Sequence, residues 1–90
     1  MNAKFSPSVQ KELQKIQRKD SKLANRIEKQ IALFEENPKH PSLRTHKLSG
    51  ATDNMWSISI TMSIRMVYVL LDRSSVVFVK IGTHNEVYGK

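Results

Sequence analysis

His84 and Tyr88, near the C-terminal end of the sequence, are candidates for acid–base chemistry and for contact with a nucleobase. An imidazole exchanges a proton near neutral pH, which suits general acid–base catalysis. A tyrosine can stack on a base or donate a proton. The alternative is that His84 is an ordinary turn residue and that Tyr88 only packs, and the residue types alone leave both interpretations open.

Arg65 interrupts an apolar run at residues 64–68. A guanidinium in such a strand is rarely buried without a partner, so it needs an acid, a carbonyl group or an anionic ligand. Two interpretations follow. Arg65 forms a salt bridge with Asp53, Asp72 or Glu86, or it emerges on an open face of the protein and binds an anion.

Three further polar residues, Arg44, His46 and Lys47, fall in a segment (residues 43–48) that we expect to form a short strand. Side chains two residues apart on a strand share a face. Arg44 and His46 should therefore point the same way, and Lys47 the opposite way unless the strand bends. The cluster is a candidate for contacts with a polyanion.

Several other kinds of site are excluded or disfavoured. The chain has no cysteine, which rules out disulfides, thiolate catalysis and Cys-ligated metals. His40, His46 and His84 lack the spacing of metal ligands, so we expect no metal site. The sequence has no glycine-rich phosphate loop, no GxSxG motif and no plausible Ser–His–Asp set, and we expect no cofactor.

The N-terminal half predicts two helices in a hairpin. Ser6 as N-cap and Pro7 as first helical residue begin one helix, and Asp20 is the expected N-cap of the second. Pro38 should end the second helix. Apolar residues recur at helical spacing in both: Val9, Leu13, Ile16, then Leu23, Ile27, Ile31 and Phe34.

After Pro41 the apolar spacing alternates, which predicts strands at residues 43–48, 55–60, 62–71 and 76–81. In the second of these, Trp56 should face the core and Ser57 the opposite side. We expect a turn at residues 49–50, and Gly82 should end the last strand and leave a tail. The fold class is α+β: a short N-terminal strand, and a helix hairpin packed on one face of a mainly antiparallel sheet of about four strands. Residues 1–90 should form a single domain with the other sheet face free.

Charge is unevenly distributed over the chain, whose formal net charge is +7. Residues 1–47 carry eleven Lys and Arg against five acids, whereas residues 48–90 carry four against three. A basic surface attracts RNA, DNA or an acidic protein, and a generic basic protein is the alternative. The longest apolar run, residues 66–71, is too short to span a bilayer, and the N-terminus lacks a signal-peptide core. We therefore expect a cytoplasmic protein with no membrane partner.

Taken together, these segments resemble the RelE/ParE superfamily of toxins from type II toxin–antitoxin systems, specifically the RelE/StbE-type mRNA interferases. The resemblance runs over nearly the whole chain. Its most specific parts are K-L-S-G at residues 47–50, R-x-V-Y at 65–68 and I-G-T-H-x-E-V-Y at 81–88, in this order.

This resemblance implies a RelE-like fold with a curved sheet, metal-independent cleavage of mRNA, commonly on the ribosome, and neutralisation by a cognate acidic antitoxin. It matches His84 to the catalytic histidine, Tyr88 to the aromatic residue that orients the base, and Arg65 to the arginine used on the scissile phosphate. The basic cluster that contacts RNA phosphates corresponds to Arg44, His46 and Lys47. Ser59 stands where many members have another arginine, and the sequence ends two residues after Tyr88, where some relatives continue.

In such an enzyme, His84 and His46 would carry out the two proton transfers, and Arg65 with Arg44 or Lys47 would stabilise charge on the phosphorane. Two other functions remain open: a ParE-like inhibitor of DNA gyrase that cleaves no bond, and a RelE-fold nucleic-acid-binding protein without activity. Convergence of Arg65, His84 and Tyr88 on one concave face would favour the enzyme, and dispersal would favour either binder.

Overall fold

A computed structural model describes residues 1–48 and 54–88. Its helices are α1 (Pro7–Lys19), α2 (Ser21–Glu36), a short 3-10 helix η1 (Pro41–Leu43) and α3 (His84–Tyr88). Its strands are β1 (Asn2–Phe5), β2 (His46–Lys47), β3 (Met55–Ser59), β4 (Ile64–Leu70) and β5 (Ser75–Thr83). None of the helices in these ranges combines the length and the hydropathy that crossing a bilayer requires.

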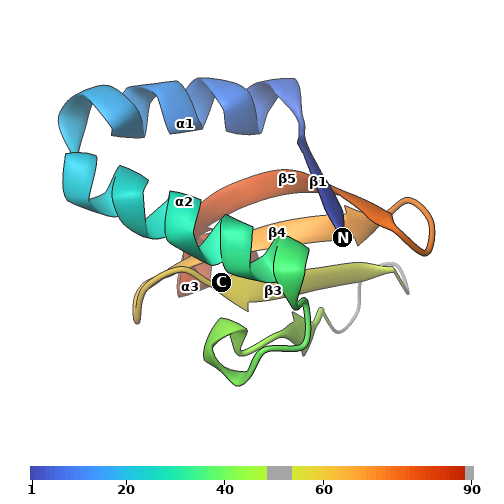
Figure 1. The fold of residues 1–90 in the computed structure, drawn as a ribbon. Coiled ribbons are helices and arrows are strands. Elements are labelled where there is room, and N and C mark those ends of the chain that lie inside the picture. The colour runs from blue at the N-terminus through green and yellow to red at the C-terminus, as the bar shows by residue number, and fades with distance from the viewer. Residues whose placement is uncertain (49–53, 89–90) are drawn as a thin grey trace.

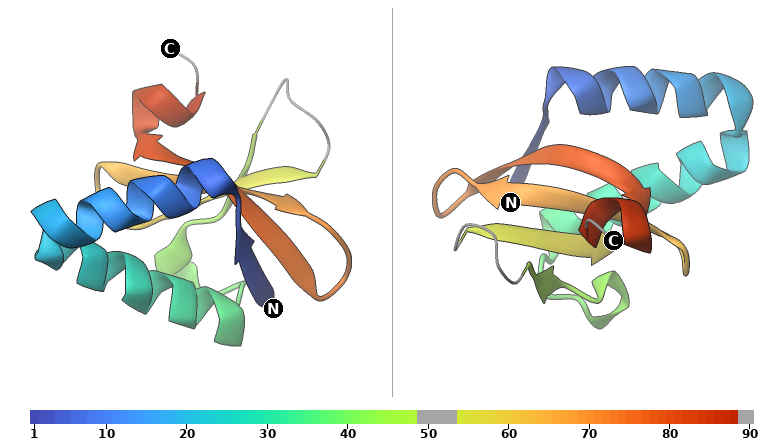
Figure 2. Two further views of the ribbon diagram at one scale, coloured as in Figure 1. Left: turned by 90° about the horizontal axis from the view of Figure 1, so that it is seen from above. Right: turned by 180° about the vertical axis from the view of Figure 1, so that it is seen from behind.

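The strands form one sheet in the order β1-β5-β4-β3-β2, with the helix hairpin on one side and α3 on the other (Figures 1 and 2). Every pairing is antiparallel except that of β1 with β5, which is parallel. The predicted α+β fold is therefore confirmed, and the N-terminal strand completes a five-stranded sheet.

Both predicted helix starts are confirmed. The Ser6 hydroxyl accepts a hydrogen bond from the Val9 amide at 3.3 Å, and the Asp20 carboxylate accepts one from the Leu23 amide at 3.1 Å. Each cap satisfies an amide that the first helical turn leaves unpaired. Because Asp20 also ends α1, the two helices are joined with almost no loop, which fixes the hairpin.

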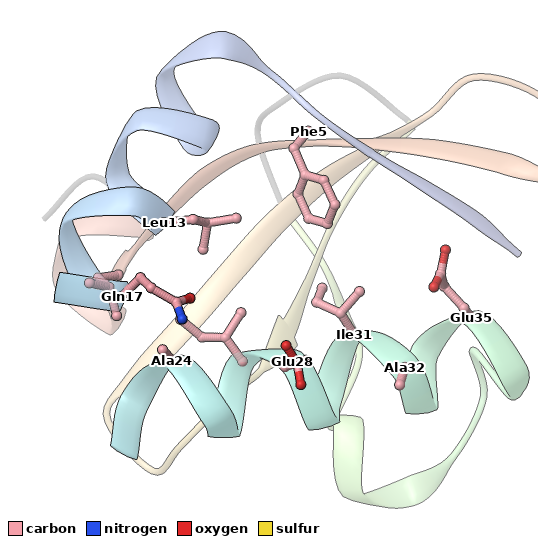
Figure 3. Close-up of a pocket in the computed structure, with 10 residues that line it drawn as sticks. Phe5, Leu13, Gln17, Ala24, Glu28, Ile31, Ala32 and Glu35 are labelled. Carbon is pink, nitrogen blue, oxygen red and sulfur yellow. The ribbon is translucent and has the colours of Figure 1, made fainter. Parts of the chain in front are cut away.

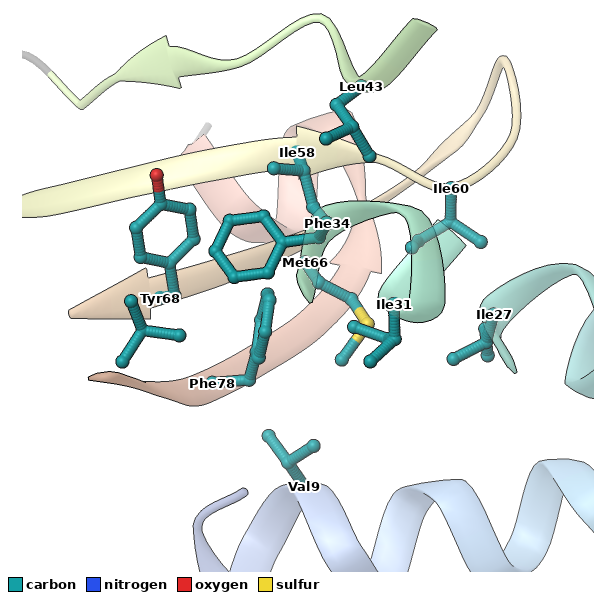
Figure 4. Packing of buried hydrophobic residues seen from close by; sticks show 11 residues of the cluster. Val9, Ile27, Ile31, Phe34, Leu43, Ile58, Ile60, Met66, Tyr68 and Phe78 are labelled. Carbon is teal, nitrogen blue, oxygen red and sulfur yellow. The ribbon is translucent and has the colours of Figure 1, made fainter. Parts of the chain in front are cut away.

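The core lies between the helix hairpin and the sheet (Figure 4). Phe34 of α2 is fully buried and packs on the rings of Tyr68 and Phe78, with centroid distances of 5.0 and 5.4 Å. Val9 of α1 packs into the same core. This layer holds β3, β4 and β5 rigid, so side chains on their opposite face have fixed positions.

Two predicted boundaries were wrong. Residues 43–48 do not form one strand: η1 ends at Leu43, and Arg44 has a left-handed backbone (φ 45°), so β2 begins only at His46. The longer strand predicted to begin at residue 62 starts at Ile64, because the Thr61 hydroxyl accepts hydrogen bonds from the amides of residues 63 and 64 in a tight turn. The turn expected at residues 49–50 lies outside the described residues.

The C-terminal segment also differs from the prediction. Strand β5 continues through Gly82 to Thr83, and the expected tail forms the helix α3. Val87 of α3 packs with Val67 and Leu48 in a second small core. The sheet face opposite the hairpin is therefore partly covered rather than free.

Candidate active site

Helix α3 is held at its start by a reciprocal pair of hydrogen bonds. The Thr83 amide donates to Glu86 Oε1 at 2.7 Å, and the Glu86 amide donates to the Thr83 hydroxyl at 3.3 Å. This is a capping box, and it places His84 as the first residue of the helix. The hydrogen bonds from Thr83, with a smaller contribution from the charge of Lys80, lower the pKa of Glu86. The cap thus favours the folded state above the usual pKa of a glutamate, and this contribution is lost as the pH falls.

Gly82 has a steric role in this turn. A Cβ atom at residue 82 would lie 2.7 Å from Glu86 Oε1 and 3.0 Å from the Glu86 Cβ. Only a residue without a side chain lets the capping glutamate fold back this closely. A side chain at residue 82 would therefore displace the Glu86 carboxylate from its capping position.

Tyr88 connects α3 to the middle of the sheet. Its hydroxyl and the Ser57 hydroxyl on β3 are 2.7 Å apart, and its ring lies 4.3 Å from the His84 ring between centroids. Ser57 is fully buried, Tyr88 is half-buried and His84 is exposed. The imidazole of His84 therefore faces solvent while its position is fixed by a ring that is itself anchored.

Arg65 lies beneath this helix and is 8% exposed. Its Nε donates to the Ser57 hydroxyl at 3.1 Å, and one terminal nitrogen donates to the carbonyl oxygens of Arg44 at 2.7 Å and Ser57 at 3.3 Å. These acceptors are neutral, and within residues 1–48 and 54–88 no carboxylate forms an ion pair with Arg65. The salt bridges considered with Asp72 and Glu86 are thus not formed, and Asp53 lies outside the described residues.

Ser57 links the candidate residues, and sequence reasoning missed it. The same hydroxyl contacts the Tyr88 hydroxyl and Arg65 Nε, so His84, Tyr88, Ser57 and Arg65 form one continuous set of contacts. The alternation of β3 correctly placed Ser57 opposite Trp56. What the alternation lacks is any sign that α3 would bury this serine.

The edge strand β2 distributes the basic cluster over both faces of the sheet. His46 pairs with Ser57, so its exposed side chain belongs to the face of Arg65. Lys47 pairs with Trp56 and belongs to the helix side, where its Nζ lies 5.9 Å from the centre of the Trp56 ring. The opposite orientation expected for Lys47 is confirmed. Arg44 does not share a strand face with His46, because its left-handed backbone precedes β2.

Two other residues complete the candidate face. Lys80, exposed on β5, pairs with Val67 and so lies on the same face as Arg65. Ser59 pairs with Arg65 across the strands, and its hydroxyl donates to the Thr61 carbonyl at 2.9 Å instead of reaching outward. The face therefore combines two exposed histidines, one exposed lysine and one buried arginine. No group of three or more His, Asp or Glu suited to a metal ion occurs among the described residues.

Comparison with known families gives a match over residues 3–88 to the ParE toxin of type II toxin–antitoxin systems. The chain belongs to the ParE toxin family. The predicted RelE/ParE superfamily is thus confirmed for this toxin, and the family whose model matches is ParE. A search of curated proteins found no match.

Solved structures support the fold of this ParE-family toxin. It is similar to a YoeB/ParE toxin from Agrobacterium tumefaciens with a TM-score of 0.78 and 21% identity, covering 93% of this chain and 99% of the other. It is also similar to a YoeB–YefM complex from Staphylococcus aureus (TM-score 0.76, 20% identity, covering 93% and 97%). The E. coli DinJ–YafQ complex gives a TM-score of 0.75 and 18% identity, covering 98% of both chains.

Proposed function

We propose that this toxin is a metal-independent endoribonuclease that cleaves mRNA on the ribosome and thereby inhibits translation in the cytoplasm. The observation that carries the proposal is the convergence of His84, Tyr88 and Arg65 through Ser57 on one side of the sheet. A protein that acts only by binding does not need a solvent-facing imidazole that is fixed against a tyrosine and linked through a serine to a buried guanidinium.

The proposed reaction uses groups of this face in three steps. One histidine, His84 or His46, removes the proton of a ribose 2′-hydroxyl, and the oxygen attacks the adjacent phosphorus. Negative charge on the resulting phosphorane is stabilised by Arg65, whose Nη1 makes no hydrogen bond within residues 1–48 and 54–88. The other histidine protonates the leaving 5′-oxygen, so the products carry a 2′,3′-cyclic phosphate and a 5′-hydroxyl.

The remaining candidates bind and orient the RNA in this proposal. Tyr88 positions His84 and offers its ring to a base for stacking. Arg44 lies just before the edge strand β2, and Lys47 lies on it. There they can neutralise phosphates of the RNA on either side of the scissile bond.

The second candidate function is inhibition of DNA gyrase, and membership of the ParE family favours it. The two functions differ in one biochemical experiment. Purified toxin is added to ribosomes carrying an mRNA, and new 5′ ends are mapped by primer extension, while the same preparation is added to gyrase and relaxed plasmid. We expect mRNA cleavage and normal supercoiling. Blocked supercoiling without mRNA cleavage would establish the gyrase inhibitor. If the toxin has neither effect, it is an inactive binding protein.

We further propose an acidic antitoxin as the partner, seated on the helix hairpin. An apolar cavity of about 310 Å³ lies between β1, α1 and α2, with Phe5, Leu13 and Ile31 directed into it (Figure 3). The cavity wall itself carries two glutamates, Glu28 and Glu35, and the exposed lysines and arginines lie on other faces of the same helices: Lys11, Lys15, Arg18, Lys22, Arg26 and Lys29. An amphipathic segment would place apolar anchors in the cavity and reach these basic faces with acidic residues at its flanks.

Co-expression with the small open reading frame that flanks the toxin gene tests this partner. We expect a stoichiometric acidic protein to purify with a tagged toxin. Ala32→Glu, which adds a bulky acidic side chain to an exposed residue of the cavity wall, should weaken the complex at least tenfold. Asn25→Glu adds the same charge to α2 away from the cavity and is the matched control. Purification of the toxin alone, or equal weakening by both variants, would refute the proposed surface.

A further inference from the structure

A second cavity, of about 540 Å³, lies on the helix side of the sheet, across β2 from the candidate active site. Its walls come from the N-terminus, the segment around η1, and the strands β3 and β4. The lining residues are Met1, Pro38, Lys39, His40, Pro41, Arg44, Thr45, Trp56, Tyr68 and Leu70. The proposed reaction and the antitoxin surface leave this cavity without a role.

Two buried polar atoms belong to residues that line this cavity. Trp56 Nε1 and Thr45 Oγ1 are both inaccessible to solvent, and neither has a hydrogen-bond partner within the described parts of the chain. An indole N–H can only donate, so Trp56 requires an acceptor that the described residues do not supply. Buried polar atoms are rarely left unpaired, so these two, in residues of the cavity wall, indicate a wall that can rearrange slightly to pair with an oxygen-bearing ligand.

The charged residues of the cavity wall indicate the sign of the charge that the ligand carries. Lys39, His40 and Arg44 line it, Lys47 lies over the Trp56 ring, and none of its described lining residues is acidic. The ligand should therefore be anionic. The apolar remainder of the wall, with Trp56 and Tyr68, suits a flat ring system.

We propose that this cavity binds one nucleotide of the RNA strand whose scissile bond lies on the opposite face of β2. The base occupies the apolar part, where a small rotation of Trp56 or Thr45 brings its buried polar atom to the base, and the phosphates on the two sides of the nucleotide contact Arg44 and Lys39. The inference rests on the proposed ribonuclease function, and continuity favours RNA over an acidic peptide: Arg44 lines this cavity while its carbonyl accepts a hydrogen bond from Arg65 in the candidate active site. His46 and Lys47 are adjacent in β2 and point to opposite faces of the sheet. They then contact the RNA on the two sides of the sheet edge.

Trp56 is the only tryptophan of the chain, so its fluorescence reports on this cavity alone. The probe is a short single-stranded RNA whose 2′-hydroxyls are methylated to prevent cleavage, with a dye at one end for anisotropy. Trp56 emission should change over the same RNA concentrations as the anisotropy. The double variant Lys39→Gln, Arg44→Gln should weaken binding about tenfold or more. It should also lower the slope of log affinity against log salt by about 1.4, the value for two lost phosphate contacts on a single strand.

The matched control is Lys11→Gln with Lys15→Gln, which removes two exposed charges from α1. Glutamine at residue 44 keeps the backbone cost of the left-handed conformation the same, so the site variant should fold, and circular dichroism verifies this. Trp56→Phe, followed by anisotropy, tests the indole donor separately and should weaken RNA binding several-fold.

Three results would overturn the inference, and they are distinguishable. In the first, the anisotropy shows RNA binding, the Trp56 emission does not change, and both double variants lose RNA affinity equally. This result would refute the cavity site and leave the ribonuclease proposal intact. Absence of any RNA binding would refute both. A Trp56 response to an acidic antitoxin peptide and none to RNA would assign the cavity to the protein partner.

Discussion

Replacing His84 by glutamine should reduce cleavage of ribosome-bound mRNA by roughly two to four powers of ten, which is the usual contribution of a general acid or base. Glutamine retains a similar shape and hydrogen-bonding capacity but cannot shuttle a proton. Because His84 is exposed and its only described ring contact is with Tyr88, RNA binding and thermal stability should stay near those of the wild type. Quantitative primer extension measures the cleavage rate, and growth after induction in cells should recover in parallel.

Asn85→Gln is the matched control, since it introduces the same residue at the next, exposed position of α3. It should cleave at the wild-type rate. Full activity of the His84 variant would show that His84 is not the proton-transfer residue. His46, which lies on the same sheet face through its pairing with Ser57, would then be the remaining histidine candidate.

The parts of this fold that could be predicted from sequence depend on neighbours along the chain. Ser6 and Asp20 cap helices by binding amides three residues ahead, so their effect is visible in a short window of sequence. The alternation in β3 placed Trp56 and Ser57 on opposite faces for the same reason. The capping box of Thr83 and Glu86 had an equally local signature, and the prediction of a tail overlooked it.

The parts that could not be predicted depend on contacts between distant segments. Ser57 is a small polar residue on an alternating strand, a pattern that normally indicates a solvated face. It is buried because α3, 31 residues away at Tyr88, crosses the sheet there. Arg44 adopts a left-handed backbone that no neighbouring residue demands, and its carbonyl meets Arg65 from 21 residues away. The sequence could therefore identify the candidate residues but not the geometry that joins them.

Arg65→Ala should lower both mRNA cleavage and stability, and the structure requires the second effect. Loss of a positive donor beside the phosphorane predicts cleavage about a hundredfold slower or worse. The same substitution removes one of the two partners of the buried Ser57 hydroxyl and leaves the Arg44 carbonyl without its side-chain donor, which should cost about 2–4 kcal/mol of unfolding free energy. An arginine that emerged on an open face, one of the two interpretations from the sequence, would contribute little to stability, whereas an Arg65 that is only 8% exposed contributes to folding. Urea unfolding measures the stability, and cleavage is assayed at a temperature where the variant is fully folded.

Two further variants separate catalysis from folding at Arg65. Ser57→Ala breaks the same buried network while keeping the guanidinium, so it should lose comparable stability and far less activity. Arg65→Lys keeps the charge but not the forked geometry that reaches Ser57 and Arg44 together, so its activity should lie between those of the wild type and the alanine variant. Arg73→Ala, an exposed arginine in the turn between β4 and β5, controls for the loss of one positive charge. Folded Arg65→Ala protein that cleaves mRNA as fast as the Arg73→Ala protein would show that Arg65 only holds β3, β4 and the η1 segment together. The negative charge of the phosphorane would then be stabilised by the exposed cations of this face.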